Sequence, residues 1–415
     1  MIHNIKNRFL KSTFARRSST LLSGALISQL IAFSFLPFIT AKYSPELIGI
    51  GVSFISISSI FSVILTLQFH SAIFLPKEKR DYDGLALLSF FSSLLITLLF
   101  LTLLIFFGDN LLNLMGLSEL NNWLFFIPLL AFFLSATQIL NNWYAKEQRF
   151  LAVSTNAVLQ SLIYNSLAVI LSALLVGSAG LIVSKITSAV LVGIIFITLF
   201  LINVTKSINI EDLFNLARKF KKFPKISFPH AIFSTAVRDL PVLIIAGYFD
   251  PRLAGLYFIG LKFSQLPMQI LSKALYSVLI MELAEAIDKK KYYIERLKWF
   301  LLISIPSTLI LIIITPLILE FLLDESFKDA SNFLYLLIPL YYFKLLGSTF
   351  SQSSLIIHQE LGFNFLIGLL IFIATIVAFY IGYLYQDLML AITIQVITNI
   401  ILVIIKLIKA YKIIQ

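Results

Sequence analysis

The stretches YSPELIG (Tyr43–Gly49) and YFDPRLAG (Tyr248–Gly255) are near-copies of one turn, placed almost half a chain apart. Pro45 and Pro251 lie 206 positions apart, and each is followed four residues later by a glycine. Proline is favoured in the first turn of a helix, so each copy predicts a short loop that leads into a helix. A turn that occurs twice predicts a chain of two related halves.

Composition places both halves in a membrane. Hydrophobic residues make up 59% of the chain and charged residues 13%, whereas soluble domains carry about 25% charged residues. Twelve apolar runs recur, each with the roughly 20 residues that a helix needs to cross a bilayer. These runs do not alternate as barrel strands do, which predicts an all-α integral membrane protein. We expect spans at 18–40, 46–75, 84–107, 122–144, 151–175, 179–203, 228–248, 252–281, 298–322, 331–357, 362–384 and 387–409.

The positive charges predict how the spans are oriented. If the N-terminus is cytoplasmic, the inner loops and both termini hold 24 Lys and Arg residues, and the outer loops hold only Lys42, Arg252 and Lys328. This asymmetry predicts an even number of spans with both termini in the cytoplasm. It also explains most of the net charge of +11, so the basic balance indicates anionic membrane lipids as a partner and no nucleic acid.

A second pair of similar segments also indicates that the chain has two related halves. IPLL at 127–130 and KEQRF from Lys146 match IPL at 338–340 and HQELGF from His358, both at an offset of 211. Two sets of six spans share one orientation, so we expect two parallel six-helix lobes around a central cavity. The predicted lobes are residues 1–205 and 226–415. Residues 206–225 form a basic cytoplasmic linker, in which LARKFKKFPKISFP reads as an amphipathic segment on the inner membrane surface.

Polar residues inside the spans form one-sided stripes. In the eighth span they fall within about 80° of arc on a helix, at Lys262, Gln265, Gln269 and Lys273. In the tenth span they fall within about 100° of arc, at Lys344, Ser348, Ser351 and Gln352. Because the other faces of these helices are apolar, the stripes are expected to line the cavity.

The charges within the spans are mostly positive. The cations are Lys185, Arg238, Lys262, Lys273 and Lys344, against one clear acid, Asp239. A charge in the bilayer centre costs at least about 2.5 kcal/mol, so these side chains should avoid lipid. They predict a cavity of positive potential for an anionic substrate such as a phosphate or pyrophosphate group.

Each residue also has a structural interpretation. Snorkelling to the interface accounts for Lys273 and Lys185 as well as a substrate role does. Arg238 is either a ligand contact or one half of a structural pair with an acid. Lys344 is the favoured substrate contact, since about 18 Å of helix separates it from the outer end of its span. Three amides of the fourth span are alternatively interhelical hydrogen-bonding groups, namely Gln138, Asn141 and Asn142.

The sequence lacks the motifs of several classes of function. The chain has no phosphate-binding loop for ATP, and it has no catalytic constellation at the membrane face. It has no cysteine, and its four histidines are dispersed, which indicates no metal cluster. The expectation is a protein that is not an enzyme and uses no cofactor.

Four longer stretches carry a family resemblance. They are the first span with Gly24, Gln29 and Pro37 followed by SPELIG, AIFLPKEKRDYDGL from Ala72, WYAKEQRF from Trp143, and FPKISFPHAIFSTAVRDLPVLIIAGYFDPRLAGLY from Phe223. Together they resemble the Wzx-type polysaccharide (O-antigen) flippases of the MOP superfamily, which includes the MATE exporters and the lipid II flippase. The resemblance implies a two-lobed bundle of twelve helices that moves an undecaprenyl-pyrophosphate-linked oligosaccharide across the bacterial inner membrane by alternating access. Where this pattern has an acid, the chain has His70.

Two other functions are possible from the sequence, a cation-coupled antiporter and a membrane scaffold. A MATE-like cation-coupled antiporter would need membrane carboxylates, and the first span has none. A membrane scaffold would not require the polar stripes. The resemblance implies a monomer that handles an O-antigen or capsule repeat unit near a glycan polymerase or glycosyltransferases.

Overall fold

The computed structural model describes residues 13–205, 208–265, 268, 279, 288–351 and 361–413, and every regular element within these ranges is helical. Eleven of the helices are long and apolar enough to span a membrane. The predicted eighth span, 252–281, lies only partly in these ranges, and its residues 251–265 are helical. The all-α fold and the pattern of spans are thereby confirmed.

The helices have large apolar side chains on their outer surfaces, as a lipid environment requires. Examples are Phe106 and Leu99, which are 71% and 59% exposed, and Phe321 and Ile313, which are 89% and 66% exposed. A soluble protein would bury such side chains, so their exposure identifies the chain as a multi-pass membrane protein.

The chain packs as two units. Unit 1 consists of residues 1–42 and Ser53–Thr235, and unit 2 of Tyr43–Val52 and residues 236–415. The first copy of the repeated turn thus belongs by packing to unit 2. The predicted lobes, 1–205 and 226–415, place it with the first half, and those sequence boundaries remain a prediction.

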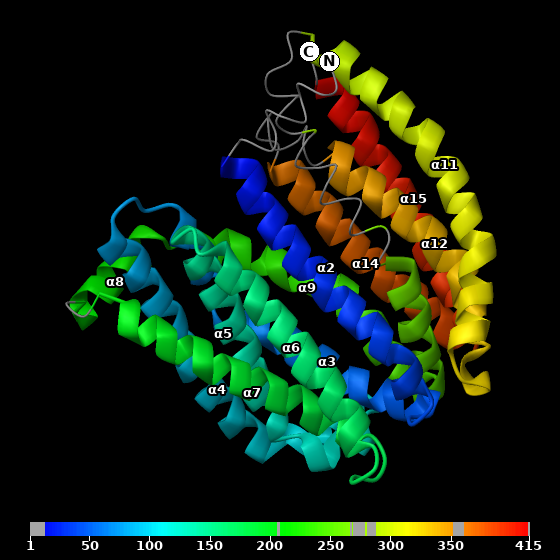
Figure 1. Cartoon of the computed structure of the whole chain (residues 1–415), viewed down its shortest axis with the longest axis horizontal. Helices are drawn as coiled ribbons and strands as arrows, with labels where there is room; N and C mark the ends of the chain where they lie inside the picture. The colour runs from blue at the N-terminus through cyan, green and yellow to red at the C-terminus, as the bar shows by residue number, and fades with distance from the viewer. Residues whose placement is uncertain are drawn as a thin grey trace. The chain divides into compact units, whose positions relative to one another are not determined.

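Unit 1 contains six of the long helices in whole or in part. They are α2 (Thr13–Thr40), α3 (Pro45–Leu65, from Ser53 onward), α4 (Lys79–Leu114), α5 (Phe126–Lys146), α6 (Phe150–Leu171) and α7 (Ala179–Asn203). Short elements connect or follow them, namely η1 (Phe69–Phe74), η2 (Ser118–Trp123), α8 (Ile210–Lys219), η3 (Phe223–Ser227) and the start of α9 (Phe228–Tyr248). Figure 1 shows α2 running alongside α6, where Ser161 Oγ donates to Ser28 O at 2.7 Å.

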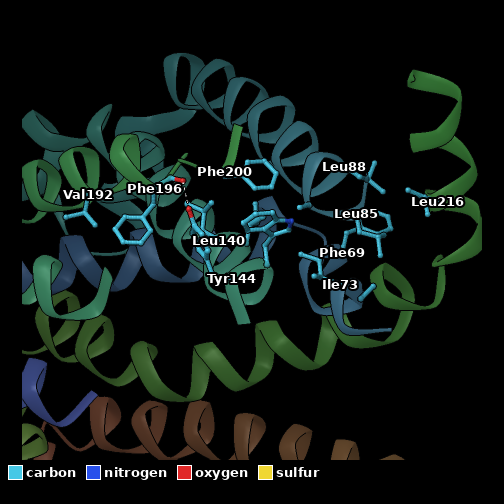
Figure 2. Packing of buried hydrophobic residues seen from close by; sticks show 14 residues of the cluster. Phe69, Ile73, Leu85, Leu88, Leu140, Tyr144, Val192, Phe196, Phe200 and Leu216 are labelled. Carbon is cyan, nitrogen blue, oxygen red and sulfur yellow. Dashed lines mark hydrogen bonds between the residues drawn. The ribbon is translucent and has the colours of Figure 1, made fainter. Parts of the chain in front are cut away.

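The core of unit 1 is aromatic. Trp143 is fully buried and packs edge-to-face on Tyr144 and Phe200, with ring centroids 5.0 Å apart in both pairs. Figure 2 shows this cluster between α4, α5 and α7, with Leu216 of α8 reaching toward Leu85.

Unit 2 holds the rest of α9, the helical residues 251–265, and four further long elements. These are α11 (Lys289–Leu322), α12 (Ala330–Leu346) with η5 (Gly347–Ser351), α14 (Leu361–Leu384) and α15 (Leu388–Ile413); η4 (Glu325–Phe327) precedes α12. Helix α15 packs against both α12 and α14. Gly260 lets residues 251–265 approach α12 closely, since a Cβ on it would lie 3.1 Å from Phe333 Cβ.

One predicted span ends earlier than expected, and another changes its helix type before the described residues stop at Ser351. The span expected at 46–75 stops at Leu65, because Leu67 and Gln68 adopt positive φ angles of 47° and 63° that no right-handed helix allows. The chain then continues as the short helix η1. The span expected at 331–357 is an α-helix only to Leu346, after which η5 winds as a wider π-type turn.

Candidate functional site

The predicted cations fall in different parts of the fold. Arg238, Lys262 and Lys344 all lie in unit 2, on α9, on residues 251–265 and on α12. Lys185 lies in unit 1 on α7, where its Nζ sits 5.6 Å from the centroid of the Tyr164 ring on α6. Three of the predicted cations therefore belong to unit 2, and we describe them within that unit.

Arg238 pairs with its neighbour Asp239. Its Nε and one terminal nitrogen donate to the two carboxylate oxygens, both at 2.8 Å. Successive helical side chains diverge by about 100°, so the long arginine stem must curl back to form this two-pronged contact. The structural pair that the sequence left open is thus present, yet the Arg238 side chain remains 54% exposed and Asp239 only 14%.

Lys262 extends the group. It is partly buried, its Nζ lies 5.1 Å from the centroid of the Phe258 ring, and it lies close enough to Arg238 and Asp239 for both charges to act on it. Cation–π contact of this kind holds an ammonium group without neutralising it. The single carboxylate, Asp239, therefore acts on two cations, Arg238 and Lys262.

Lys344 lies against an aromatic ring of its own helix. Its Nζ lies 4.9 Å from the centroid of the Tyr341 ring, one turn earlier on α12. Tyr341 is 8% exposed and lies within electrostatic range of Arg238 and Asp239. The sequence analysis missed this residue, although its position three before Lys344 is the spacing at which helical side chains meet.

The predicted polar lining is only partly described. Gln265 ends the helical residues 251–265 and is partly buried, and Ser348 donates its hydroxyl to Leu345 O at 3.1 Å. Ser351 is fully buried, and its hydroxyl has no hydrogen-bond partner among the described residues. The other predicted stripe residues, Gln269, Lys273 and Gln352, lie outside the described residues.

Helix α15 adds two buried amides that the stripes did not include. Gln395 and Asn399 are 4% and 1% exposed, and their side-chain oxygens accept no hydrogen bond within the described part of the chain. Their spacing of four residues on a helix that packs against α12 was the available signal. These acceptor oxygens give unit 2 further buried polar groups beside the helix that bears Lys344.

The amides of α5 do hold helices together, as the sequence allowed. Gln138 donates to Ser62 Oγ at 3.3 Å, and Asn142 donates to His70 O at 3.1 Å. Asn141 accepts from Asn156 Nδ2 at 3.2 Å. These residues connect α5 to α3, η1 and α6 within unit 1, so the interhelical role is confirmed.

Unit 2 contains three of the predicted cations and the carboxylate of Asp239, and the anion site they were predicted to form remains a prediction. Arg238 presents a planar fork that suits phosphate oxygens, and the two lysines add compact charges. Charges of this kind inside a bilayer need water or a counter-ion. Within the described residues, no cluster of three or more metal-ligating side chains occurs.

Comparison with known proteins identifies the family. The model of the polysaccharide biosynthesis protein family matches residues 43–332, which is more than half of the chain. A search of curated protein sequences finds no match to the chain. Among solved structures, the chain resembles the lipid II flippase MurJ in an inward closed conformation, with a TM-score of 0.76 and 17% identity over 94% of this chain and 89% of MurJ.

Two further structures share the fold. A MOP superfamily transporter from Pyrococcus furiosus has a TM-score of 0.64 at 16% identity, over 95% of this chain and 94% of that one. The MATE multidrug transporter DinF-BH has a TM-score of 0.66 at 14% identity, with the same two coverages. The predicted resemblance to MOP-superfamily flippases is thereby confirmed, and the chain belongs to the polysaccharide biosynthesis protein family.

Proposed function

We propose that this protein is a flippase that moves an undecaprenyl-pyrophosphate-linked oligosaccharide, an O-antigen or capsule repeat unit, across the bacterial inner membrane. The observation that carries the proposal is the cationic group of unit 2, in which Arg238, Lys262 and Lys344 outnumber the one acid, Asp239. A pyrophosphate is the part of such a substrate that needs cations. The family and the MurJ-like fold support a lipid-linked cargo.

In this mechanism the protein transports and catalyses no reaction. Lys344 and Lys262 attract the pyrophosphate, and Arg238, whose guanidinium is oriented by Asp239, binds it. The lipid tail stays in the bilayer while the two lobes alternate access between the leaflets. Both termini are cytoplasmic, the protein acts as a monomer, and a glycan polymerase or glycosyltransferases work nearby.

Complementation tests this proposal. The chain is expressed in a bacterium that makes the matching repeat unit but lacks its own flippase, and surface glycan is scored for wild type, Lys344→Ala and Lys344→Arg at matched membrane abundance. The matched control is Lys328→Ala, which removes an exposed lysine whose partner is Glu325. Wild type, Lys344→Arg and Lys328→Ala should restore glycan, and Lys344→Ala should not.

Two results would contradict the proposal. Full activity of Lys344→Ala would remove this residue from substrate handling. Absence of rescue by wild type, together with export of cationic dyes from everted vesicles, would replace the flippase with a MATE-like cation-coupled antiporter.

A further inference from the structure

Helix α8 has two different faces. At about 100° per residue, Phe214 points about 160° away from Leu216, and Ile210, Phe214, Arg218 and Glu211 fall within about 100° of arc on that side. The helix is 10 residues long and begins with a capping box between Asn209 and Asp212. It is therefore a defined amphipathic element.

One face of α8 is fixed against unit 1. Leu216 is 7% exposed, and its Cδ1 lies only 2.4 Å from where a Cβ on Gly84 would be. Asp212 accepts from Arg80 at 2.9 Å, and Lys219 donates to Asp81 at 3.0 Å. One apolar contact and two ion pairs set the rotation of the helix about its axis, so the opposite face must point away from unit 1.

The opposite face begins with Ile210, Phe214 and one acid, Glu211, and is followed by basic residues. Ile210 and Phe214 are 74% and 64% exposed. The cations that follow are also exposed and form no ion pair with any described residue; they are Arg218, Lys221, Lys222 and Lys225. Large apolar side chains beside unpaired lysines are the pattern of a helix that lies in a membrane interface.

The position of α8 in unit 1 is also consistent with a place in the membrane interface. It lies beside the start of α4 in Figure 1. The ends of neighbouring spans meet at this level: Lys79 at the start of α4 bonds Glu147 just after α5 at 3.1 Å, and Arg149 before α6 bonds Asn203 at the end of α7 at 3.3 Å. A helix at the ends of membrane spans is at the height of lipid headgroups.

We propose that the outer face of α8 and the basic residues after it form a binding surface for anionic lipid headgroups. Ile210 and Phe214 enter the boundary between headgroups and acyl chains. Arg218, Lys221, Lys222 and Lys225 draw anionic phospholipids to that side of unit 1. This surface is separate from the proposed substrate site, and it holds whether or not the protein is a flippase.

The test uses the absence of cysteine in the chain. A single thiol introduced by Phe214→Cys is labelled with bimane, whose ring system takes the place of the phenyl ring. The protein is placed in nanodiscs of phosphatidylcholine and phosphatidylglycerol. Quenching of bimane is compared between nitroxide-labelled phosphatidylglycerol and nitroxide-labelled phosphatidylcholine, which measures lipid preference at α8 directly. The control label replaces Val176, which is 94% exposed in the loop between α6 and α7.

Phosphatidylglycerol should quench the label at residue 214 more than phosphatidylcholine does, and the label at residue 176 should show no such preference. The triple variant Lys221→Gln, Lys222→Gln, Lys225→Gln should weaken the preference by roughly fivefold for each lysine at low salt, and the triple Lys→Glu variant should abolish it. The triple Lys→Arg variant should keep it, and added salt should weaken it.

Two outcomes would overturn the inference. Equal quenching by the two lipids would show that the face meets the bilayer without selecting anionic headgroups. Absence of quenching by either lipid would show that the face is not on the bilayer, and label emission that then changes with protein concentration would assign it to contact with a second copy.

Discussion

Gly49 and Gly255 lie against each other's turns in unit 2. A Cβ on Gly49 would lie 1.8 Å from Pro251 O, and a Cβ on Gly255 would lie 1.8 Å from Pro45 O. Each added Cβ would also lie 3.1 Å from the backbone nitrogen of the other glycine. The two copies of the repeated turn therefore contact one another reciprocally, as two related segments do across a local twofold axis.

This contact predicts a cost for the smallest possible side chain. Gly49→Ala and Gly255→Ala should each lower the free energy of unfolding by about 1–3 kcal/mol or more, because the obstacle is backbone and cannot rotate away. The double variant should cost less than the sum, since one separation of the turns makes room for both methyl groups. Thermal unfolding in detergent measures the three variants.

Gly362→Ala is the matched control. A Cβ at Gly362 would meet nothing within 4 Å, and the residue lies in the first turn of α14. Alanine should be neutral there or stabilising by about 0.5–1 kcal/mol. Equal effects at Gly49 and Gly362 would contradict the close approach.

Tyr341 should matter for transport through its ring. Tyr341→Phe keeps the platform under Lys344 and should retain activity, whereas Tyr341→Leu removes a cation–π contact worth about 0.5–2 kcal/mol. The expected result is a loss of glycan export in the leucine variant alone, scored by the same complementation at matched abundance. Equal loss in both variants would assign the role to the hydroxyl group.

Asp83 should be the most costly acid to neutralise in unit 1. It is fully buried, and its carboxylate accepts from Trp143 Nε1 at 2.7 Å and from the backbone nitrogen and hydroxyl of Thr205 at 2.9 and 2.7 Å. Asp83→Asn replaces one acceptor with a donor, so the free energy of unfolding should fall by about 1.5–3 kcal/mol.

The control for Asp83 is Asp81→Asn, two residues earlier. Asp81 is 32% exposed and pairs with an exposed lysine, Lys219. Such surface pairs contribute about 0–1 kcal/mol. Thermal unfolding of both variants measures the two losses of stability. A loss at Asp81→Asn as large as that at Asp83→Asn would contradict the buried hydrogen-bond network.

Glu147 should make stability depend on pH. Burial by itself would raise the pKa of its carboxyl, but hydrogen bonds from Tyr82 and Lys79 outweigh burial and lower that pKa. A lowered pKa in the folded state stabilises the fold above the ordinary value of about 4.3, and the contribution disappears as the pH falls through the folded pKa.

Glu147→Gln should therefore lower the unfolding midpoint most at neutral pH. The gap to wild type should close as the pH falls below the ordinary range of a glutamic acid. Unfolding in detergent from pH 7 down to about pH 2 measures this gap, and a gap of constant size over that range would mean that the charge of Glu147 contributes nothing.

Local patterns in the sequence determined the spans. The runs expected at 179–203, 228–248 and 362–384 match α7, α9 and α14 to within one residue, because about 20 apolar residues in lipid have to close their hydrogen bonds within one helix. The repeated turn, the two-fold organisation and the unequal charges of the spans could also be predicted from the sequence, since each is a property of spacing or composition.

Tertiary structure decided the rest. The bond between Arg238 and Asp239 depends on a side-chain conformation, and the contact of Lys344 with the Tyr341 ring depends on how both side chains are turned on α12. Hydrophobic periodicity also missed the left-handed residues Leu67 and Gln68, which end α3 early. The contact of Gly49 with Gly255 joins residues 206 positions apart. Local sequence specifies which segments become helices, but the partner of each side chain depends on atoms brought together only when those helices pack.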